Sequence, residues 1–361
     1  MTTADITPPL RSDLAQLPRY IAGTPPRAGA GPGYKLSSNE VAEGIDGRVV
    51  AAGTRALAGV NRYPDISNAV LLDRLSTHLG VGRERILVGG GSIAVLQDLV
   101  QTLTDPGDAV VFAWRSYEAY PIVIRVGRAT PIAVPLSPSH RHDLPAMAEA
   151  VHEHDARVVI VCNPNNPTGS TVTGPELEQF LAAVPPSCLV VLDEAYREFV
   201  TDETVPDGVE LAVDRANVVV LRTFSKAHGL AGLRVGYAVA PPRVVEAVRS
   251  VALPFTVSSV AQAAAVAALD VWPTQQRAVA EIACRRDQFA KSLRRLGVGA
   301  TASQANFVWL PWSPVVTAAV QAWSDRGISV RQFGQEGVRI TIGEPEALES
   351  VVAVLRDGVA R

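Results

Sequence analysis

The sequence has few cysteines, and their positions exclude a disulfide framework. Cys162, Cys188 and Cys284 are an odd number and lie far apart in the chain, so they show neither paired spacing nor the pattern of a structural zinc site. This usage is typical of a reducing cytoplasm, and we expect a cytoplasmic protein. Residues 1–9 also lack a basic stretch followed by an apolar one, so we expect no signal peptide.

The chain also lacks long apolar runs and any large excess of charge. No apolar run is long enough to span a bilayer. The formal net charge of -3 gives no electrostatic reason for binding to nucleic acid or to an anionic membrane. A length of 361 residues, of which 47% are hydrophobic, is enough for a large core and indicates two domains.

Lysine is scarce in this chain. The 33 basic residues of the Lys+Arg count include just three lysines, which are Lys35, Lys226 and Lys291. Of these, Lys226 is the one that lies where an apolar strand, 218–221, meets a glycine-rich loop. An amine in that position can form a Schiff base with an aldehyde cofactor, and Thr223, Ser225 and Arg234 can bind the phosphate of such a cofactor. A surface lysine in an ordinary loop explains this stretch equally well.

The middle of the chain alternates short apolar segments with segments of helical periodicity. The predicted strands are 86–88, 109–112, 131–134, 158–161, 189–192, 218–221 and 235–239. The predicted helices are 48–57, 69–79, 93–103, 144–152, 175–183 and 242–251. This alternation predicts an α/β fold with a mostly parallel central sheet that is covered by helices on both faces.

Both ends of the chain depart from this alternation. Residues 1–34 are rich in proline, glycine and alanine and predict an arm. After Pro254 the sequence predicts helices over 258–269 and from 273 onward, and then strands at 306–310, 328–331 and 338–342, which indicate a smaller α+β domain. We therefore expect three parts, listed here in order: 1–44, the arm and part of the small domain; 45–257, a large cofactor-binding domain; 258–361, an interdomain helix and the C-terminal small domain.

Three further motifs follow predicted strands, at the edge where open α/β sheets bind ligands. The run 89–93, Gly-Gly-Gly-Ser-Ile, leads into a helix whose N-terminus can bind an anion, although a tight turn also explains the glycines. The run 163–169 contains two Asn-Pro steps and predicts a rigid turn, whose amides can donate to a phenolate-type oxygen. Asp193 ends an apolar strand, so its carboxylate should be partly buried and needs a partner, which a protonated ring nitrogen would supply. Alternatively, Asp193 caps the N-terminus of a helix.

Four histidines gather in one polar stretch, at His140, His142, His152 and His154. Two pairs at a spacing of two residues are compatible with a metal site. No supporting carboxylate or cysteine pattern accompanies them, so we expect no metal there.

The order of the strand-end motifs resembles that of fold-type I pyridoxal-phosphate aminotransferases. Within them the chain is most similar to the histidinol-phosphate aminotransferase family, and there to the aromatic amino acid aminotransferases of actinobacteria. The resemblance covers nearly the whole chain, and it implies an aspartate-aminotransferase-like large domain. The segments that carry it are 35–40, 61–65, 163–169, 193–196, 222–236, 254–259, 303–310 and 338–342.

The resemblance implies a role for each of several residues around the cofactor, pyridoxal 5'-phosphate. Lys226 holds the cofactor and later moves the proton between substrate and cofactor. Asp193 pairs with the ring nitrogen, Tyr196 and Asn166 hydrogen-bond the ring hydroxyl oxygen, and Tyr117 stacks on the ring. The resemblance assigns phosphate contacts to Gly91, Ser92, Ile93, Thr223, Ser225 and Arg234.

The resemblance also implies a homodimer and a substrate site. Tyr63 adds a phosphate contact across the dimer interface, which makes each site composite. The implied substrate residues are Arg339, which binds the carboxylate, and Asn39 and Asn306, which line that site. By their residue types, Arg331 can add a second guanidinium to this site and Tyr20 an apolar surface.

Some positions depart from the family pattern. Where the family often has asparagine and an acidic residue, this chain has Gly90 and Ile93, so only backbone contacts carry over there. The run 112–115, Phe-Ala-Trp-Arg, replaces a common Thr-Pro and leaves open whether Trp114 or Tyr117 stacks on the cofactor.

The expected reaction is transamination between an aromatic L-amino acid and 2-oxoglutarate. Arg331 and Arg339 together can also clamp a phosphate, so histidinol phosphate remains an alternative substrate. The aromatic interpretation rests on the likeness of 112–121, 254–259 and 303–311 to the aromatic enzymes. A pyridoxal-phosphate decarboxylase or lyase is a second alternative, because the fold does not fix the reaction.

Overall fold

The computed structural model describes residue 11 and residues 17–359 of the chain. Most of the first half of the predicted N-terminal arm, residues 1–10 and 12–16, lies outside the described residues, as do residues 360–361. Within the described part no helix is long and apolar enough to cross a membrane.

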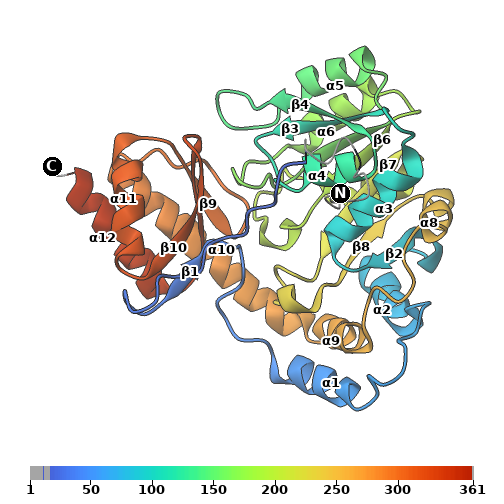
Figure 1. Cartoon of the computed structure of the whole chain (residues 1–361), viewed down its shortest axis with the longest axis horizontal. Helices are drawn as coiled ribbons and strands as arrows, with labels where there is room; N and C mark the ends of the chain where they lie inside the picture. Colours follow the sequence, from blue (N-terminus) through green and yellow to red (C-terminus); the bar gives the residue numbers. More distant parts are fainter. Residues whose placement is uncertain (1–10, 12–16, 360–361) are drawn as a thin grey trace, which may run out of the picture.

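The larger sheet contains seven strands among the described residues, in the order β2-β8-β7-β6-β5-β3-β4 (Figure 1). Its strands are β2 (Ile86–Gly89), β3 (Ala109–Trp114), β4 (Thr130–Pro135), β5 (Val158–Cys162), β6 (Leu189–Asp193), β7 (Val218–Thr223) and β8 (Gly236–Val239). All neighbours pair in parallel except β8, which is antiparallel to both β2 and β7. The prediction of a mostly parallel sheet is therefore confirmed.

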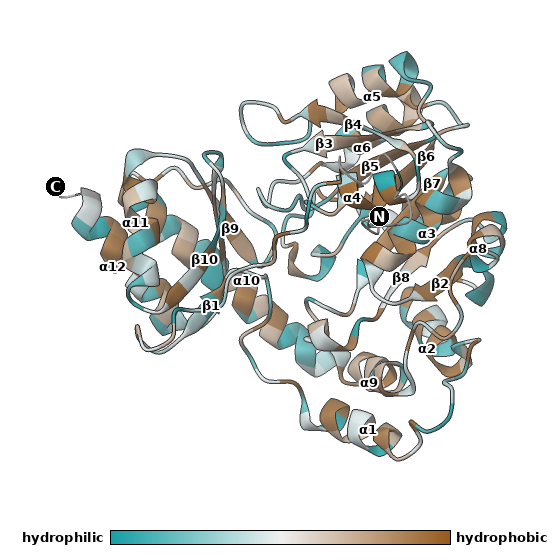
Figure 2. Cartoon of the chain, in the orientation of Figure 1, coloured by the Kyte–Doolittle hydropathy of each residue, from teal (hydrophilic) through white to brown (hydrophobic). Residues whose placement is uncertain are grey.

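Helices cover both faces of this sheet, which explains why its central strands are apolar at every position. In β7, Val218 and Val220 belong to one core cluster and Val219 and Leu221 to the other. The first cluster includes residues of α1 (Gly47–Leu57), α2 (Ala69–Leu79), α5 (Leu144–Glu153), α6 (Gly174–Ala183), α7 (Gly208–Asp214) and α9 (Ser259–Asp270). The second includes residues of α3 (Ser92–Leu103), α4 (Tyr120–Val126) and α8 (Pro242–Arg249). Figure 2 shows the brown apolar strands enclosed between these helices.

The smaller sheet joins the two ends of the chain. Its order in the described part is β1-β10-β11-β9, with β1 (Tyr34–Leu36), β9 (Phe307–Pro311), β10 (Ile328–Phe333) and β11 (Gly337–Thr341). β1 pairs in parallel with β10, so that Tyr34 lies opposite Ile328. The helices α10 (Trp272–Arg295), α11 (Pro314–Ser324) and α12 (Pro345–Val359) accompany this sheet, and their buried residues share one core with it.

The predicted elements agree closely with the observed ones. Each end of the predicted strands and helices lies within two residues of its observed position. The ends of α2 show why, because Leu71, Leu72 and Leu75 make its buried stripe and Gly80, at φ 68°, stops it in a conformation that favours glycine. The strand β1 and the helices α4, α7, α11 and α12 were not among the predicted elements.

The topology brings the carboxyl ends of β5, β6 and β7 to one edge of the larger sheet. Cys162 pairs with Asp193, and Asp193 with Leu221, so the three strands end side by side. The smaller sheet lies across from this edge, and the segment before β1 passes between the two sheets (Figure 1). The site described next lies there.

Candidate active site

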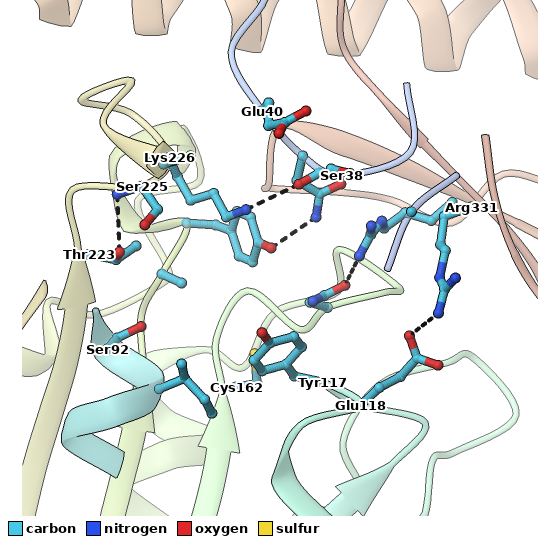
Figure 3. Close-up of a pocket in the computed structure, with 18 of the residues that line it drawn as sticks. Ser38, Glu40, Ser92, Tyr117, Glu118, Cys162, Thr223, Ser225, Lys226 and Arg331 are labelled. Carbon is cyan, nitrogen blue, oxygen red and sulfur yellow. Dashed lines mark hydrogen bonds and ion pairs between the residues drawn. The ribbon is translucent and has the colours of Figure 1, made fainter. Parts of the chain in front are cut away.

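A cavity at this edge is lined by residues from both sheets and from the N-terminal segment (Figure 3). It collects most of the residues that the sequence pointed to. Those predicted residues that line it are Tyr20, Asn39, Ser92, Ile93, Tyr117, Asn166, Asp193, Tyr196, Thr223, Ser225, Lys226, Arg234, Arg331 and Arg339.

Lys226 reaches into the cavity from the loop after β7. Its Nζ donates a hydrogen bond of 3.3 Å to the backbone carbonyl of Ser38. Burial lowers the pKa of Lys226 to about 7, and the charges of Arg339 and Arg234 act in the same direction, while Glu40 and Asp193 oppose them. A large fraction of this amine is therefore neutral near pH 7, which is the form that attacks a carbonyl carbon.

Asp193 is the last residue of β6, and it is 6% exposed. The hydroxyl of Tyr120 donates to its Oδ2 at 2.6 Å, and the Ala195 N–H donates to its Oδ1 at 3.3 Å. Burial raises the pKa of Asp193, while these hydrogen bonds and the charge of Lys226 lower it. A buried carboxylate that has two neutral donors as its direct partners is well placed to receive a cationic group.

Tyr196 and Asn39 form a buried pair on the same side of the cavity. The Asn39 Nδ2 donates to the Tyr196 hydroxyl at 2.9 Å, and the Asn39 N–H donates to Thr341 Oγ1. Asn306, in contrast, is fully buried and is not among the described residues that line the cavity. Its Nδ2 donates to the Asn39 carbonyl at 3.2 Å. The structure therefore places Asn306 behind Asn39, as a support for it.

The predicted phosphate residues surround the start of α3, a helix of 12 residues whose N-terminus favours an anion. Gly91 has φ 97°, a conformation that favours glycine, and a Cβ there would lie 2.5 Å from the Arg234 Nη2, so the arginine would have to move. Arg234 Nη1 donates to the Ser225 hydroxyl at 3.1 Å, and the Ser225 N–H donates to Thr223 Oγ1. Hydroxyls, a guanidinium and a helix N-terminus together make a set of donors that suits a phosphate.

The two predicted substrate arginines differ in their partners. Arg339 is 7% exposed; it donates to the Asn166 side-chain oxygen and, at 2.8 Å, to the Ser37 carbonyl. Its Nε has no hydrogen-bond partner within the described residues, and burial lowers its pKa. Arg331 instead pairs with Glu118 at 2.7 Å and donates to the Ala22 carbonyl.

The aromatic residues near the cavity separate into two groups. Tyr117 lines the cavity, with the Tyr20 ring edge-on to it at 6.2 Å between centroids. Trp114 does not appear among the described residues of the lining; the Arg115 guanidinium lies 4.2 Å from its ring centroid. This arrangement favours Tyr117 over Trp114 as the ring that meets a ligand.

Tyr63 lies away from this cavity. Its side chain is 83% exposed and stacks on Phe255 with 4.6 Å between ring centroids. A contact with the cofactor site of the same chain is therefore not present in the described structure, and the prediction of a contact across a dimer interface stays a prediction.

The sequence reasoning assigned no role to several residues that contact the site. These are Tyr120, which hydrogen-bonds Asp193, and Ser38, Glu118 and Cys162, which line the cavity. Tyr120 follows Tyr117 by three residues, which is a helical spacing, and this was the one available signal. The four histidines of the 140–154 stretch do not line the cavity, and among the described residues no group of three or more potential ligands is placed to hold a metal.

Comparison with known proteins gives a consistent result. Residues 32–355 match the family model described as aminotransferase class I and II. The chain is 47% identical to an aromatic amino acid aminotransferase of Streptomyces coelicolor over 95% of this chain and 96% of that one. It is 46% identical to an aromatic amino acid aminotransferase of Rhodococcus jostii over 99% and 98%.

Among solved structures, the chain is similar to a histidinol-phosphate aminotransferase from Sinorhizobium meliloti in complex with pyridoxal-5'-phosphate. The TM-score is 0.84 at 29% sequence identity, and the match covers 91% of this chain and 90% of that one.

Proposed function

The chain belongs to the class I and II aminotransferase family, and from this we propose that it transfers the amino group of an aromatic L-amino acid to 2-oxoglutarate. The products are an aromatic 2-oxo acid and L-glutamate. The observation that carries the proposal is that one cavity holds Lys226, with its lowered pKa, the buried Asp193, and Arg339 with an unused donor.

The cofactor in this proposal is pyridoxal 5'-phosphate, and the residues present fit it. When bound, it supplies an aldehyde for the amine and a ring that withdraws electrons from the substrate carbon. The donor set of Ser92, Thr223, Ser225 and Arg234, beside Gly91, suits the phosphate. Asp193 lies where its carboxylate can hold a proton on a ring nitrogen.

The chain's own residues then divide the remaining work. Lys226, which is neutral in large part near pH 7, takes a proton from the substrate carbon and returns it. Asn166 and Tyr196 donate toward the ring hydroxyl oxygen, and Asn39 orients the Tyr196 hydroxyl. Arg339 binds the substrate carboxylate, because its Nε is free to donate and its other contacts are to neutral oxygens.

The aromatic substrate is supported by the relatives at 46% to 47% identity, which are aromatic amino acid aminotransferases. The cavity wall agrees with it, since Tyr20, Tyr117 and Phe333 provide ring surfaces. Histidinol phosphate is the second candidate, and the Sinorhizobium meliloti structure at 29% identity favours it less strongly.

A panel of amino donors tests the substrate. We expect phenylalanine and tyrosine to react with 2-oxoglutarate at a higher kcat/KM than histidinol phosphate does. Different aromatic rings should be tolerated, because differences of one methylene are worth only about 1–3 kcal/mol. Steady-state kinetics with each donor measures this, and a preference of more than about tenfold for histidinol phosphate, roughly 1.4 kcal/mol, would identify the other member of the family.

The division of the chain follows from the same proposal. We place the cofactor on a large domain of residues 45–257, and the closing part of the site on residues 1–44 and 258–361. The site then lies at a domain boundary, where small-molecule sites are common. A cytoplasmic location agrees with the free thiols of Cys162, Cys188 and Cys284.

A homodimer is the assembly that we propose. Large apolar side chains are exposed on α1, on the 58–70 segment and near 253–255: Val50, Leu57, Val60, Tyr63, Ile66, Val70, Leu253 and Phe255. The stacking of Tyr63 on Phe255 joins the 58–70 segment to the 253–255 segment, and the Gln262 Nε2 of α9 donates to the Asp65 carbonyl. Exposed apolar side chains in this number suit contact with a second copy of the chain.

Mixed dimers test whether the sites are composite. A dimer with Tyr63→Phe in one subunit and Lys226→Ala in the other is expected to contain one fully wild-type site, because the intact Lys226 and the intact Tyr63 meet across the interface. Its cofactor affinity per active site should equal that of the wild type, whereas the Tyr63→Phe homodimer should bind cofactor more weakly. If a verified mixed dimer keeps the weakened affinity, the phosphate contact does not cross the interface.

A further inference from the structure

Arg331 and Arg339 lie directly opposite each other in the smaller sheet. They are register partners on the antiparallel strands β10 and β11, and both line the cavity. Both residues are largely buried, at 9% and 7% exposure of the whole residue. Like charges that face each other across two strands destabilise the pair, so this arrangement needs at least one anion nearby.

Glu118 supplies that anion to one arginine. It comes from the loop between β3 and α4, across the cavity from β10, and its Oε2 lies 2.7 Å from the Arg331 Nη2 (Figure 3). The side chains in this ion pair are 25% and 11% exposed, so solvent screens the pair less than it screens a surface pair. Arg339 has no carboxylate within ion-pair distance in the described part of the chain, and it therefore remains available to an incoming anion.

The remaining contacts of Arg331 decide how a ligand could reach its guanidinium. The Phe333 ring centroid lies close to both guanidinium groups, 5.3 Å from that of Arg331 and 5.7 Å from that of Arg339. The other terminal nitrogen of Arg331, Nη1, donates a hydrogen bond to the Ala22 carbonyl. A ligand anion that reached Arg331 would thus compete directly with the Glu118 carboxylate for the same donors.

We propose that Glu118 is a specificity-determining residue that competes with a second anionic group of the substrate for Arg331. A substrate with one carboxylate needs Arg339 alone. A dicarboxylate such as 2-oxoglutarate or glutamate, or a phosphate-bearing amine, must displace Glu118 before it can use Arg331. Glu118 thereby shifts selectivity toward donors with an uncharged side chain. This inference rests on the proposed function, because it concerns the substrate of that site.

The neutral variant Glu118→Gln tests the competition. We expect it to lower KM for 2-oxoglutarate and to raise the kcat/KM of histidinol phosphate relative to phenylalanine by about tenfold, since a close charge pair in a partly buried site carries energy of that order. Glu118→Asp keeps the charge and should stay near the wild-type ratio. Steady-state kinetics with all three substrates measures the KM for 2-oxoglutarate and the ratio of the two kcat/KM values.

The double variant Glu118→Gln with Arg331→Gln separates competition from a merely structural role. In a protein that already carries Arg331→Gln, removal of Glu118 should change neither the KM for 2-oxoglutarate nor the kcat/KM of histidinol phosphate relative to phenylalanine. If Glu118→Gln moves KM for phenylalanine and 2-oxoglutarate equally, or if the double variant keeps the tenfold gain, the proposal is overturned.

The proposed function can fail separately from this inference. Turnover of phenylalanine by the wild-type enzyme tests the function itself. If phenylalanine does not react, the KM for 2-oxoglutarate in Glu118→Gln is measured with histidinol phosphate as the donor, and it still decides whether Glu118 competes for Arg331.

Discussion

Replacing Lys226 by alanine is expected to abolish transamination. The other lysines, Lys35 and Lys291, are not among the described residues that line the cavity, so neither is placed to replace Lys226. The variant loses both the covalent attachment of the cofactor and the proton transfer at the substrate carbon, and each contributes orders of magnitude, so we expect a loss of at least about 10⁴-fold. Steady-state assays with an aromatic donor and 2-oxoglutarate measure it.

Binding of the cofactor should survive this replacement. The phosphate donors around Gly91 and Arg234 remain in place, so dialysis-resistant binding should weaken without disappearing. Lys291→Ala is the matched control, because Lys291 is exposed and should be replaceable at no cost in rate. Measurable steady-state turnover by Lys226→Ala would remove Lys226 from its proposed role.

Capture of the cofactor by the cofactor-free protein should depend on pH around neutrality. The neutral amine attacks the aldehyde, and the pKa of Lys226 is lowered from 10.5 to about 7. The neutral fraction, and with it the capture rate, should therefore rise as the pH rises through about 7 and then level off. Rapid-mixing absorbance measures the rate. A rate that keeps rising toward about pH 10 would indicate an ordinary lysine.

Replacing Asp193 by alanine is the second large effect that we expect. With the cofactor bound, its carboxylate would hold a proton on the ring nitrogen and so let the ring accept electrons from the substrate carbon. The loss of one such preorganised group costs roughly 10²–10³ in kcat. Cofactor binding should fall much less than the rate, because the phosphate donors are unchanged. Measured together, kcat and the cofactor dissociation constant separate these effects, and a fall in activity of less than tenfold would show that the role is wrong.

Two further variants grade this effect. Asp193→Asn keeps the shape and removes the charge, so it should resemble Asp193→Ala in rate. Tyr120→Phe removes the 2.6 Å hydrogen bond to Asp193 and leaves the carboxylate in place. It should cost about tenfold, since it removes a single hydrogen bond to a charged group.

Much of the site was accessible to sequence reasoning because of where its residues stand in the chain. Lys226, Asp193 and Asn166 each follow an apolar run that reads as a strand, and parallel strands end at a common edge. The resemblance to fold-type I pyridoxal-phosphate aminotransferases, inferred from these motifs, is confirmed by the match of residues 32–355 to the class I and II aminotransferase family. Asn306 shows the limit of the method, since a polar residue beside a strand can equally well support another residue.

What the sequence alone determined is therefore the local and periodic part of the protein. The alternation of strands and helices, the mostly parallel sheet, and the place of Lys226 just after a strand all follow from patterns within a few residues. The tertiary structure decided which distant residues form hydrogen bonds and ion pairs with the residues of the site. Tyr120 meets Asp193 across 73 residues of sequence, Glu118 meets Arg331 across 213, and Asn39 meets Thr341 across 302. Hydrogen bonds and ion pairs act over a few ångströms of space, and no short sequence pattern records which distant residues folding brings within that range.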